Sequence, residues 1–148
     1  MGMIVRAVTA ADREQWEPLW RGYNVFYDRP DFPREITDVT WSRFLDPAEP
    51  MFAAVAEVDG KIVGIVHYLY HRSTTMTDDV CYLQDLFTAP HARGRGAGRA
   101  LIEHVCSEAA KAGSERVYWN THEDNPARYL YDRVATLSSF RRYIRELA

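Results

Sequence analysis

The sequence predicts a mixed α/β fold, with a twisted mixed sheet flanked by about four helices. The 148-residue chain has the length of one ordinary domain, and 47% hydrophobic with 26% charged residues is the composition of a globular protein with its own core. Segments of strand and helix periodicity follow the order β-α-α-β-β-β-α-β-α-β, and a glycine-rich turn joins the fourth strand to the next helix. No repeat or linker divides the chain, so we expect residues 1–148 to form a single domain.

The first third of the chain predicts one strand and two helices. Residues 4–8 are expected to form a short strand, and Thr9 is placed to cap a helix that begins directly after it. Two prolines, Pro30 and Pro33, end this helix, and a second short helix is expected over residues 37–45. The apolar side chains of the first helix fall at helical spacing: Trp16, Leu19, Trp20, Tyr23, Val25 and Phe26.

The middle of the chain predicts three strands. Residues 52–58 and 62–70 flank Asp59-Gly60, a pair typical of a two-residue hairpin turn. After a polar loop, residues 80–87 form the next expected strand.

The last third predicts two helices and two strands. The helix expected over residues 99–112 ends at Gly113, the residue type that most often terminates a helix. We expect a strand at residues 116–121, a helix at 126–133 and a final strand at 140–147.

Charge and cysteine content exclude several classes of protein. The net charge is −3, so the chain as a whole is a poor match for nucleic acid. No apolar run is long enough to span a membrane, and the N-terminus lacks the apolar core of a signal peptide. Cys81 and Cys106 are expected to be reduced thiols, and no histidine or cysteine spacing suits a metal site. We therefore expect a cytoplasmic protein without metal, membrane or nucleic-acid partners.

Three glycines, Gly94, Gly96 and Gly98, separate the fourth strand from its helix. Glycine lets the backbone approach a ligand closely, and the N–H groups that begin a helix attract anions. The turn therefore predicts a diphosphate site, because a connection that needs glycine only for steric reasons would not require the positive charge of the three arginines beside it. It lacks the Lys-Ser/Thr pair of a Walker loop and the glycine spacing of the dinucleotide fingerprint. Three arginines lie between and beside the glycines: Arg93, Arg95 and Arg99.

Residues 86–101, LFTAPHARGRGAGRAL, resemble the acetyl-CoA signature of the GNAT N-acetyltransferases. The family pattern of arginine or glutamine followed by two glycines is present as Arg93-x-x-Gly96-x-Gly98. The order of the expected elements is also similar to that fold over most of the chain. The resemblance implies a GNAT-like fold.

Within the family, residues 82–87 and 130–135 resemble polyamine and histone-type acetyltransferases. The resemblance implies an enzyme that transfers an acetyl group from acetyl-CoA directly to a primary amine in a ternary complex. A non-catalytic acyl-CoA sensor on the same fold is the alternative. A homodimer is expected by the same analogy and from the many aromatic residues.

The resemblance also implies which residues hold acetyl-CoA and protonate the product thiolate. Backbone groups at the end of the fourth strand pair with the pantetheine arm, and N–H groups of the glycine turn hold the diphosphate. Tyr131 matches the family tyrosine that gives a proton to the departing thiolate. Asn125 lies near the family's cofactor-contacting asparagine, although it precedes Tyr131 by six residues and the usual interval is seven. The cofactor-binding residues are then Leu86, Phe87, Thr88, Arg93, Gly94, Arg95, Gly96, Ala97, Gly98, Arg99 and Asn125.

Asp85 is the candidate general base. In the polyamine enzymes that the chain resembles, a glutamate proposed as the base matches Gln84, and an amide cannot accept the proton. Successive side chains of a strand face opposite sides, so one of Gln84 and Asp85 faces the active site. Asp85 is therefore expected to act directly or through water, and a purely structural carboxylate is the equal alternative.

The expected acceptor is a small cationic amine, either polyamine-like or lysine-like. In this fold the acceptor lies against the first two helices and the loop before the fourth strand, and these segments are rich in acids. Arginines in the same segments offer an alternative, because they can pair with the acids and leave only a solvated face. The acids are Glu17, Asp28, Asp31, Glu35, Asp38, Asp78 and Asp79, and the arginines are Arg21, Arg29, Arg34 and Arg72.

Overall fold

The computed structural model describes residues 2–148, and it contains one mixed sheet in the order β1-β2-β3-β4-β5. The first three pairings are antiparallel, and β4 pairs with β5 in parallel. The strands are β1 (Met3–Ala7), β2 (Met51–Val58), β3 (Lys61–His71), β4 (Val80–Thr88) and β5 (Val117–Tyr118). The helices are α1 (Arg13–Phe26), α2 (Arg34–Leu45), α3 (Ala97–Lys111) and α4 (Arg128–Val134), with single 3₁₀ turns at Ala10–Asp12 and Pro90–Ala92.

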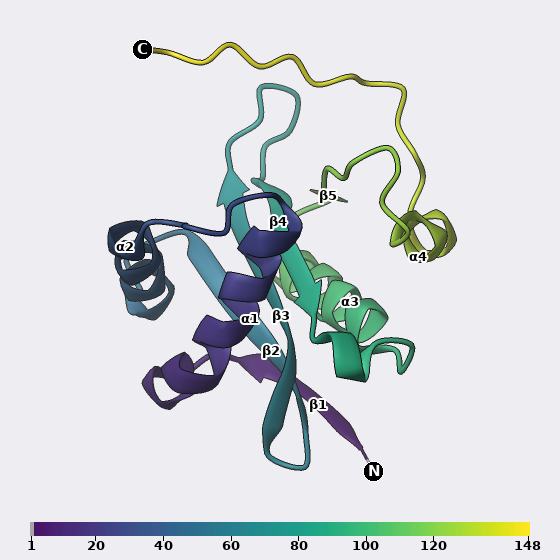
Figure 1. Ribbon diagram of the computed structural model, residues 1–148. Coiled ribbons are helices and arrows are strands. Elements are labelled where there is room, and N and C mark those ends of the chain that lie inside the picture. Colours follow the sequence, from purple (N-terminus) through teal and green to yellow (C-terminus); the bar gives the residue numbers. More distant parts are fainter. Residues whose placement is uncertain (1) are drawn as a thin grey trace.

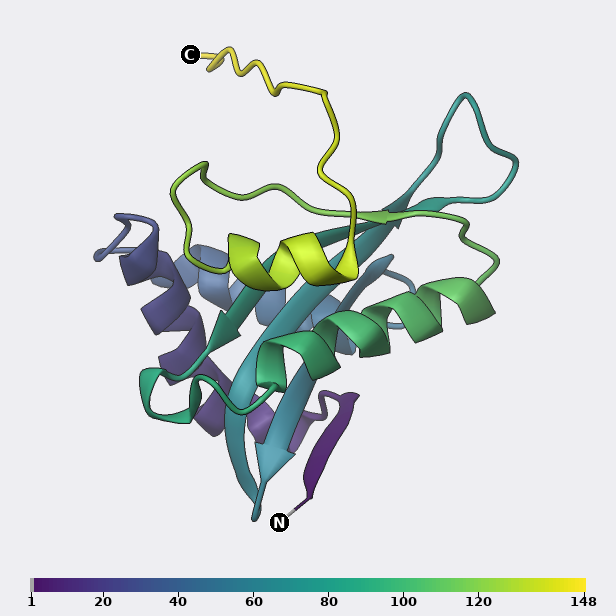
Figure 2. The ribbon, with the colours of Figure 1, turned by 90° about the vertical axis from the view of Figure 1, so that its right-hand side faces the viewer.

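Helices cover both faces of the sheet. Helices α1 and α2 lie on one face and α3 lies on the other (Figures 1 and 2). Ile65 and Val66 are consecutive residues of β3, their side chains point to opposite faces, and both are fully buried. On α1, Trp16, Leu19 and Tyr23 form part of the apolar stripe that packs on the sheet. The predicted mixed α/β fold is confirmed.

Local turn chemistry agrees with the sequence. Asp59 and Gly60 have φ angles of 52° and 75°, as a tight hairpin turn between two right-twisted strands requires. Gly113 ends α3 with a φ of 88°. Helix α2 begins a few residues earlier than expected, at Arg34.

Two strand predictions at the C-terminal end need correction. The strand expected at residues 116–121 is only Val117–Tyr118, because β5 leaves the sheet after two pairs with β4. The final strand expected at 140–147 does not form, and residues 136–148 have no helix or strand. A strand needs a neighbour for its backbone groups, and after α4 the chain runs away from the sheet (Figures 1 and 2).

A β-bulge lies in the middle of β4. His67 and Tyr68 of β3 are consecutive, but they face Asp85 and Leu83 of β4, so Gln84 is the extra residue. The Gln84 side chain is exposed, whereas the Asp85 side chain is turned inward, with 12% of its surface exposed. The bulge therefore brings Asp85 to the α1 face of the sheet.

An ion-pair cluster ties the first strand to the turn before α1. Arg6 donates to both oxygens of Asp12 at 2.8 and 2.9 Å and to Glu57 at 2.8 Å. The hydrogen bonds from Arg6 lower the pKa of Asp12 to about 2 against the burial that opposes them, and the Thr9 N–H assists. A carboxyl whose pKa is lower in the folded protein stabilises it above the unfolded pKa, and this contribution is lost as the pH falls through the folded pKa.

We expect Asp12→Asn to lower the free energy of unfolding by about 1–2 kcal/mol at pH 7, because the neutral amide loses the ion pair with Arg6. Solvent around the partly exposed Arg6 weakens this ion pair and keeps the effect in that range. The difference from wild type should shrink as the pH falls from about 4 through 2, where the wild-type carboxyl takes up its proton. Urea unfolding at several pH values measures both quantities, with exposed Asp124→Asn as the control. A difference as large at pH 2 as at pH 7 would contradict this account of Asp12.

Candidate active site

The glycine turn leads directly from the end of β4 to the start of α3. Gly94 and Gly96 have φ angles of 81° and 87°, and no atom outside their chain neighbours lies within 4 Å of where a Cβ would stand. The first helical hydrogen bond runs from the Ala100 N–H to the Gly96 carbonyl at 3.0 Å. The N–H groups of Ala97, Gly98 and Arg99 therefore begin the helix without a partner from the preceding turn of the helix, which creates a site for an anion.

The side chain of Arg93 links the glycine turn to the end of β4. Its Nε donates to the Thr88 carbonyl at 3.2 Å, and its guanidinium carbon lies 5.5 Å from the centre of the Phe87 ring. Arg95 and Arg99 are exposed beside the same turn. All three arginines add positive charge where the predicted diphosphate site lies.

The last residues of β4 have an open backbone edge. β5 pairs with β4 only at Cys81 and Tyr82, so the rest of β4 has no strand on that side. The Ala89 N–H donates to the Val63 carbonyl at 2.8 Å, and hydrogen-bonded pairs alternate along an antiparallel ladder. By this alternation, Phe87 directs its backbone groups to β3, and the groups of Leu86 and Thr88 face the open side. The Arg93 hydrogen bond to Thr88 agrees with that direction.

Asp85 belongs to a buried chain of hydrogen bonds that the sequence did not predict. Asp85 Oδ2 lies 2.9 Å from His67 Nδ1, and His67 Nε2 accepts a hydrogen bond of 2.9 Å from the Trp16 indole N–H. The His67 side chain is 3% exposed and lies against aromatic rings, including that of Phe44. A lone histidine in an apolar strand was the only signal in the sequence.

Two tyrosines, Tyr23 on α1 and Tyr27 directly after that helix, lie near the same carboxylate. Burial raises the pKa of Tyr23, and the charge of Asp85 and a hydrogen bond to it raise that pKa further. Burial followed by the charge of Asp85 also raises the pKa of Tyr27, against hydrogen bonds with Asn125 and Thr121 that lower it. The two rings pack against each other, with their centres 4.8 Å apart.

Tyr131 lies on α4, next to this group. Its ring packs edge-on against Trp119, with the ring centres 5.4 Å apart. Burial, followed by the neighbouring Tyr27, raises the pKa of Tyr131 to about 12. Tyr27 thus lies near both Tyr131 and Asp85. Helix α4 also touches the glycine turn, because a Cβ on Gly98 would lie 3.4 Å from Leu130.

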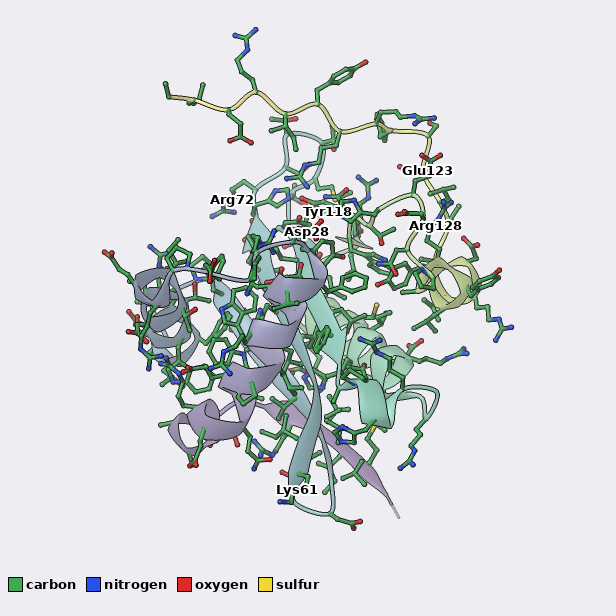
Figure 3. All side chains as sticks on the ribbon, viewed as in Figure 1. Asp28, Lys61, Arg72, Tyr118, Glu123 and Arg128 are labelled. Carbon is green, nitrogen blue, oxygen red and sulfur yellow. The ribbon has the colours of Figure 1, made fainter. Side chains whose placement is uncertain are left out.

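Asn125 has a structural role in the loop before α4. Its Nδ2 donates to the Thr121 hydroxyl at 2.9 Å, and its Oδ1 accepts from the Ala127 N–H at 2.9 Å. Arg128 donates to the Glu123 carbonyl at 2.7 Å in the same loop, where Figure 3 shows the two residues close together. Both polar groups of Asn125 therefore hold the turn that places α4.

The expected acidic surface is partly neutralised. Glu17 is paired with Arg13, Arg21 and Arg34, at 2.8, 3.4 and 3.1 Å, and Arg13 also binds Asp38 at 2.6 Å. Among the remaining acids, Asp79 is half-buried and lies 3.6 Å from Arg72, and the others are exposed: Asp28, Asp31, Glu35 and Asp78. Figure 3 places Asp28 and Arg72 at the same end of the sheet as Tyr118, and Lys61 at the opposite end.

Arg29 follows α1 and is held over its aromatic side chains. Its Nε donates to the buried Asn24 Oδ1 at 2.9 Å. Its guanidinium carbon lies 5.9, 5.6 and 5.9 Å from the ring centres of Tyr23, Tyr27 and Phe32. The sequence offered Arg29 as a partner for acids, but the structure instead places this cation beside the tyrosines near Asp85.

Within residues 2–148, no three histidine, cysteine, aspartate or glutamate side chains gather as a metal site. In the same range, no helix is long and apolar enough to cross a membrane.

Comparison with known proteins gives matches over nearly the whole chain. The model of the acetyltransferase (GNAT) family matches residues 10–135. The D-amino-acid N-acetyltransferase HPA3 of Saccharomyces cerevisiae is 37% identical over 136 residues, which cover 90% of this chain and 84% of that protein. The uncharacterized N-acetyltransferase YhfO of Bacillus subtilis is 27% identical over 135 residues, which cover 88% and 87%.

Solved structures share the fold. AAC(6')-Iy in complex with a bisubstrate analog superimposes with a TM-score of 0.85 at 18% identity, over 100% of this chain and 99% of that chain. A ribosomal-protein-alanine N-acetyltransferase from Brucella melitensis has a TM-score of 0.81 at 19% identity, over 99% and 100%.

Proposed function

The chain belongs to the acetyltransferase (GNAT) family, and from that premise we propose how its residues transfer an acetyl group and which amine receives it. The protein is an N-acetyltransferase that uses acetyl-CoA. We infer direct transfer to a primary amine in a ternary complex. The observation that carries this inference is the continuous arrangement of an open strand edge, a glycine turn and an inward-facing carboxylate.

The residues present fit acetyl-CoA, which supplies a thioester-activated acetyl group when it is bound. The open backbone groups of Leu86 and Thr88 are proposed to pair with the pantetheine arm, with Phe87 packing between them. The unpartnered N–H groups that begin α3 and the charge of Arg93, Arg95 and Arg99 suit a diphosphate. The open space around Gly94 and Gly96 allows a ligand to approach their backbone. The remaining proposed contacts are Ala97, Gly98 and Asn125, with Asn125 acting through the turn that it holds.

Two side chains are proposed to move the protons of the reaction. Asp85, directly or through water, takes the proton that the acceptor amine must lose before it attacks. Tyr131 gives its hydroxyl proton to the thiolate that leaves. A tyrosine whose pKa is raised to about 12 keeps its proton at neutral pH, so Tyr131 is a donor and not a base.

We propose that the acceptor is small and cationic, and that it is an amino acid of the lysine kind rather than a polyamine. The amine to be acetylated approaches Asp85, and Arg29 lies beside the tyrosines around Asp85, at a place suited to a carboxylate. The relative HPA3 is named as a D-amino-acid N-acetyltransferase. The pairing of Glu17 and Asp38 with arginines removes part of the acidic surface that a polycation would need.

An acceptor panel with acetyl-CoA tests this function. The panel contains D- and L-lysine, neutral D- and L-amino acids, spermidine and an aminoglycoside, and the measurement is release of free thiol. We expect the highest kcat/KM with lysine, and a higher value with a neutral amino acid would contradict the cationic acceptor. A highest kcat/KM with spermidine would overturn the proposed acceptor class, and no thiol release with any primary amine would overturn the proposed transfer.

We expect Arg29→Gln to raise the KM for lysine about 10-fold or more, because a charge-assisted hydrogen bond is worth about 1.5–3 kcal/mol. The KM for 1,5-diaminopentane, which is lysine without its carboxylate, should stay within about twofold of wild type. Arg21→Gln is the matched control, since Arg21 pairs with Glu17 on the same helix. An equal rise for both acceptors would show that Arg29 supports the structure of the site and does not bind a carboxylate.

The C-terminal residues support the proposal of a homodimer. Five large hydrophobic side chains between residues 137 and 147 are 66–96% exposed, which is unusual for a protein that acts as a monomer. We propose that this segment packs on a second copy of the chain, which supplies the strand neighbour that residues 140–147 lack. We also propose that the enzyme is cytoplasmic, because Cys81 and Cys106 are free cysteines and the cytoplasm keeps thiols reduced. The exposed side chains are Leu137, Phe140, Tyr143, Ile144 and Leu147.

We expect deletion of residues 137–148 to convert a dimer into a monomer, because the deletion removes the exposed apolar surface and leaves α4 intact. Sedimentation of the full chain and of the shortened chain measures the change, with Arg141→Ser as a control in the same segment. A full chain that sediments at its monomer mass of 17.1 kDa would contradict the dimer.

A further inference from the structure

The tautomer of His67 follows from its two hydrogen-bond partners. The Trp16 indole N–H can only donate, and it lies 2.9 Å from His67 Nε2, so Nε2 must be the unprotonated nitrogen. The ring hydrogen is then on Nδ1, which lies 2.9 Å from Asp85 Oδ2 and donates to it. A second proton on Nε2 would point directly at the indole hydrogen, and the surrounding Trp20 and Phe44 rings offer no other partner.

We infer that Trp16 and His67 are positioning residues, which hold Asp85 as an oriented carboxylate at the reacting end of the site. The inference rests on the proposed role of Asp85 as the base. The indole N–H of Trp16 holds His67 in the Nδ1–H form, and His67 donates this N–H to Oδ2 of Asp85. His67 therefore cannot take the proton from Asp85, so the proton that leaves the acceptor amine stays on the carboxyl until solvent removes it.

The groups around Asp85 come from β3, from α1 and from the turn after α1. His67 faces it from β3, Tyr23 faces it from α1, and Tyr27 and Arg29 follow that helix. His67 holds Asp85 through the 2.9 Å hydrogen bond between Nδ1 and Oδ2.

Nitrogen-15 NMR of the histidine-labelled wild-type enzyme tests the tautomer without any activity measurement. We expect His67 to show a protonated Nδ1 and a bare Nε2 that accepts a hydrogen bond. In Trp16→Phe, which keeps an aromatic ring but lacks the N–H, we expect the Nε2 resonance to move, because this nitrogen no longer accepts that hydrogen bond. A protonated Nε2 in the wild type, or an unchanged His67 in Trp16→Phe, would overturn the inference.

Two substitutions of His67 separate positioning of Asp85 from satisfaction of the Trp16 N–H. His67→Asn can place its amide N–H where Nδ1 lies and still donate to Asp85, whereas His67→Gln can place its amide oxygen where Nε2 lies and accept from Trp16. We expect kcat/KM to fall about 10- to 100-fold in His67→Gln and less in His67→Asn, with KM for acetyl-CoA unchanged in both. The reverse order, or equal losses that follow thermal stability, would show a purely structural histidine.

The variant Asp85→Asn separates this inference from the proposed function. If Asp85→Asn keeps wild-type kcat at all pH values, Asp85 is not the base and the positioning role falls with it, although the tautomer stands. If Asp85→Asn loses about 100-fold or more while His67→Gln is fully active, Asp85 remains the base and the positioning by His67 and Trp16 is wrong.

Discussion

Replacing Tyr131 with phenylalanine is expected to lower kcat about 100-fold or more and to leave the Kd of acetyl-CoA within about twofold of wild type. The hydroxyl is proposed to protonate the leaving thiolate, and this thiolate forms only as the thioester bond breaks. The ring packing against Trp119 remains in the variant, so α4 should keep its place. Rapid-quench or steady-state thiol release gives kcat, and calorimetry with acetyl-CoA gives the Kd.

The pH profile makes the test of Tyr131 specific. The wild-type rate should not fall through deprotonation of Tyr131 until the pH approaches its pKa of about 12, so the basic limb below that pH belongs to other groups. Tyr129→Phe is the matched control, because Tyr129 lies on the same helix and is 80% exposed. Near-normal turnover of Tyr131→Phe across the pH range would reduce Tyr131 to a packing residue.

Replacing Gly96 with alanine is expected to weaken acetyl-CoA binding about 10- to 100-fold. Gly96 has a φ of 87°, a left-handed conformation that costs a residue with a Cβ about 1–2 kcal/mol. No atom within 4 Å would obstruct the new methyl group, so the backbone conformation alone is the cause. If the turn relaxes to relieve this strain, the N–H groups that begin α3 lose their direction, and each charge-assisted hydrogen bond lost costs about 1.5–3 kcal/mol.

Gly60 provides a close control for this substitution. It has a φ of 75° in the β2–β3 hairpin, and an added Cβ there also meets nothing within 4 Å. Gly60→Ala should therefore lower the free energy of unfolding about as much as Gly96→Ala and leave the Kd of acetyl-CoA unchanged. Equal Kd values for the two variants would show that the glycine turn does not hold the cofactor.

The sequence by itself determined the local features of this protein. The Asp59-Gly60 turn, the helix stop at Gly113 and the amphipathic stripe of α1 depend on neighbours a few residues away, and each could be predicted from its own segment. The glycine turn with its arginines could be predicted equally well, since a strand, a turn and a helix N-terminus follow one another in the chain. The family resemblance rested on this segment.

The tertiary structure alone decided which side chains meet across the sheet. Trp16 and His67 are 51 residues apart, and His67 meets Asp85 only because the bulge at Gln84 shifts the β3–β4 register by one residue. A pattern of periodicity fixes which face a residue occupies but not its partner, because strand register and helix packing are set by the whole core. For the same reason the strand expected at 140–147 does not form, because it has no partner strand within its own chain. The backbone groups of a strand need a neighbouring strand, and the sequence of one strand does not specify that neighbour.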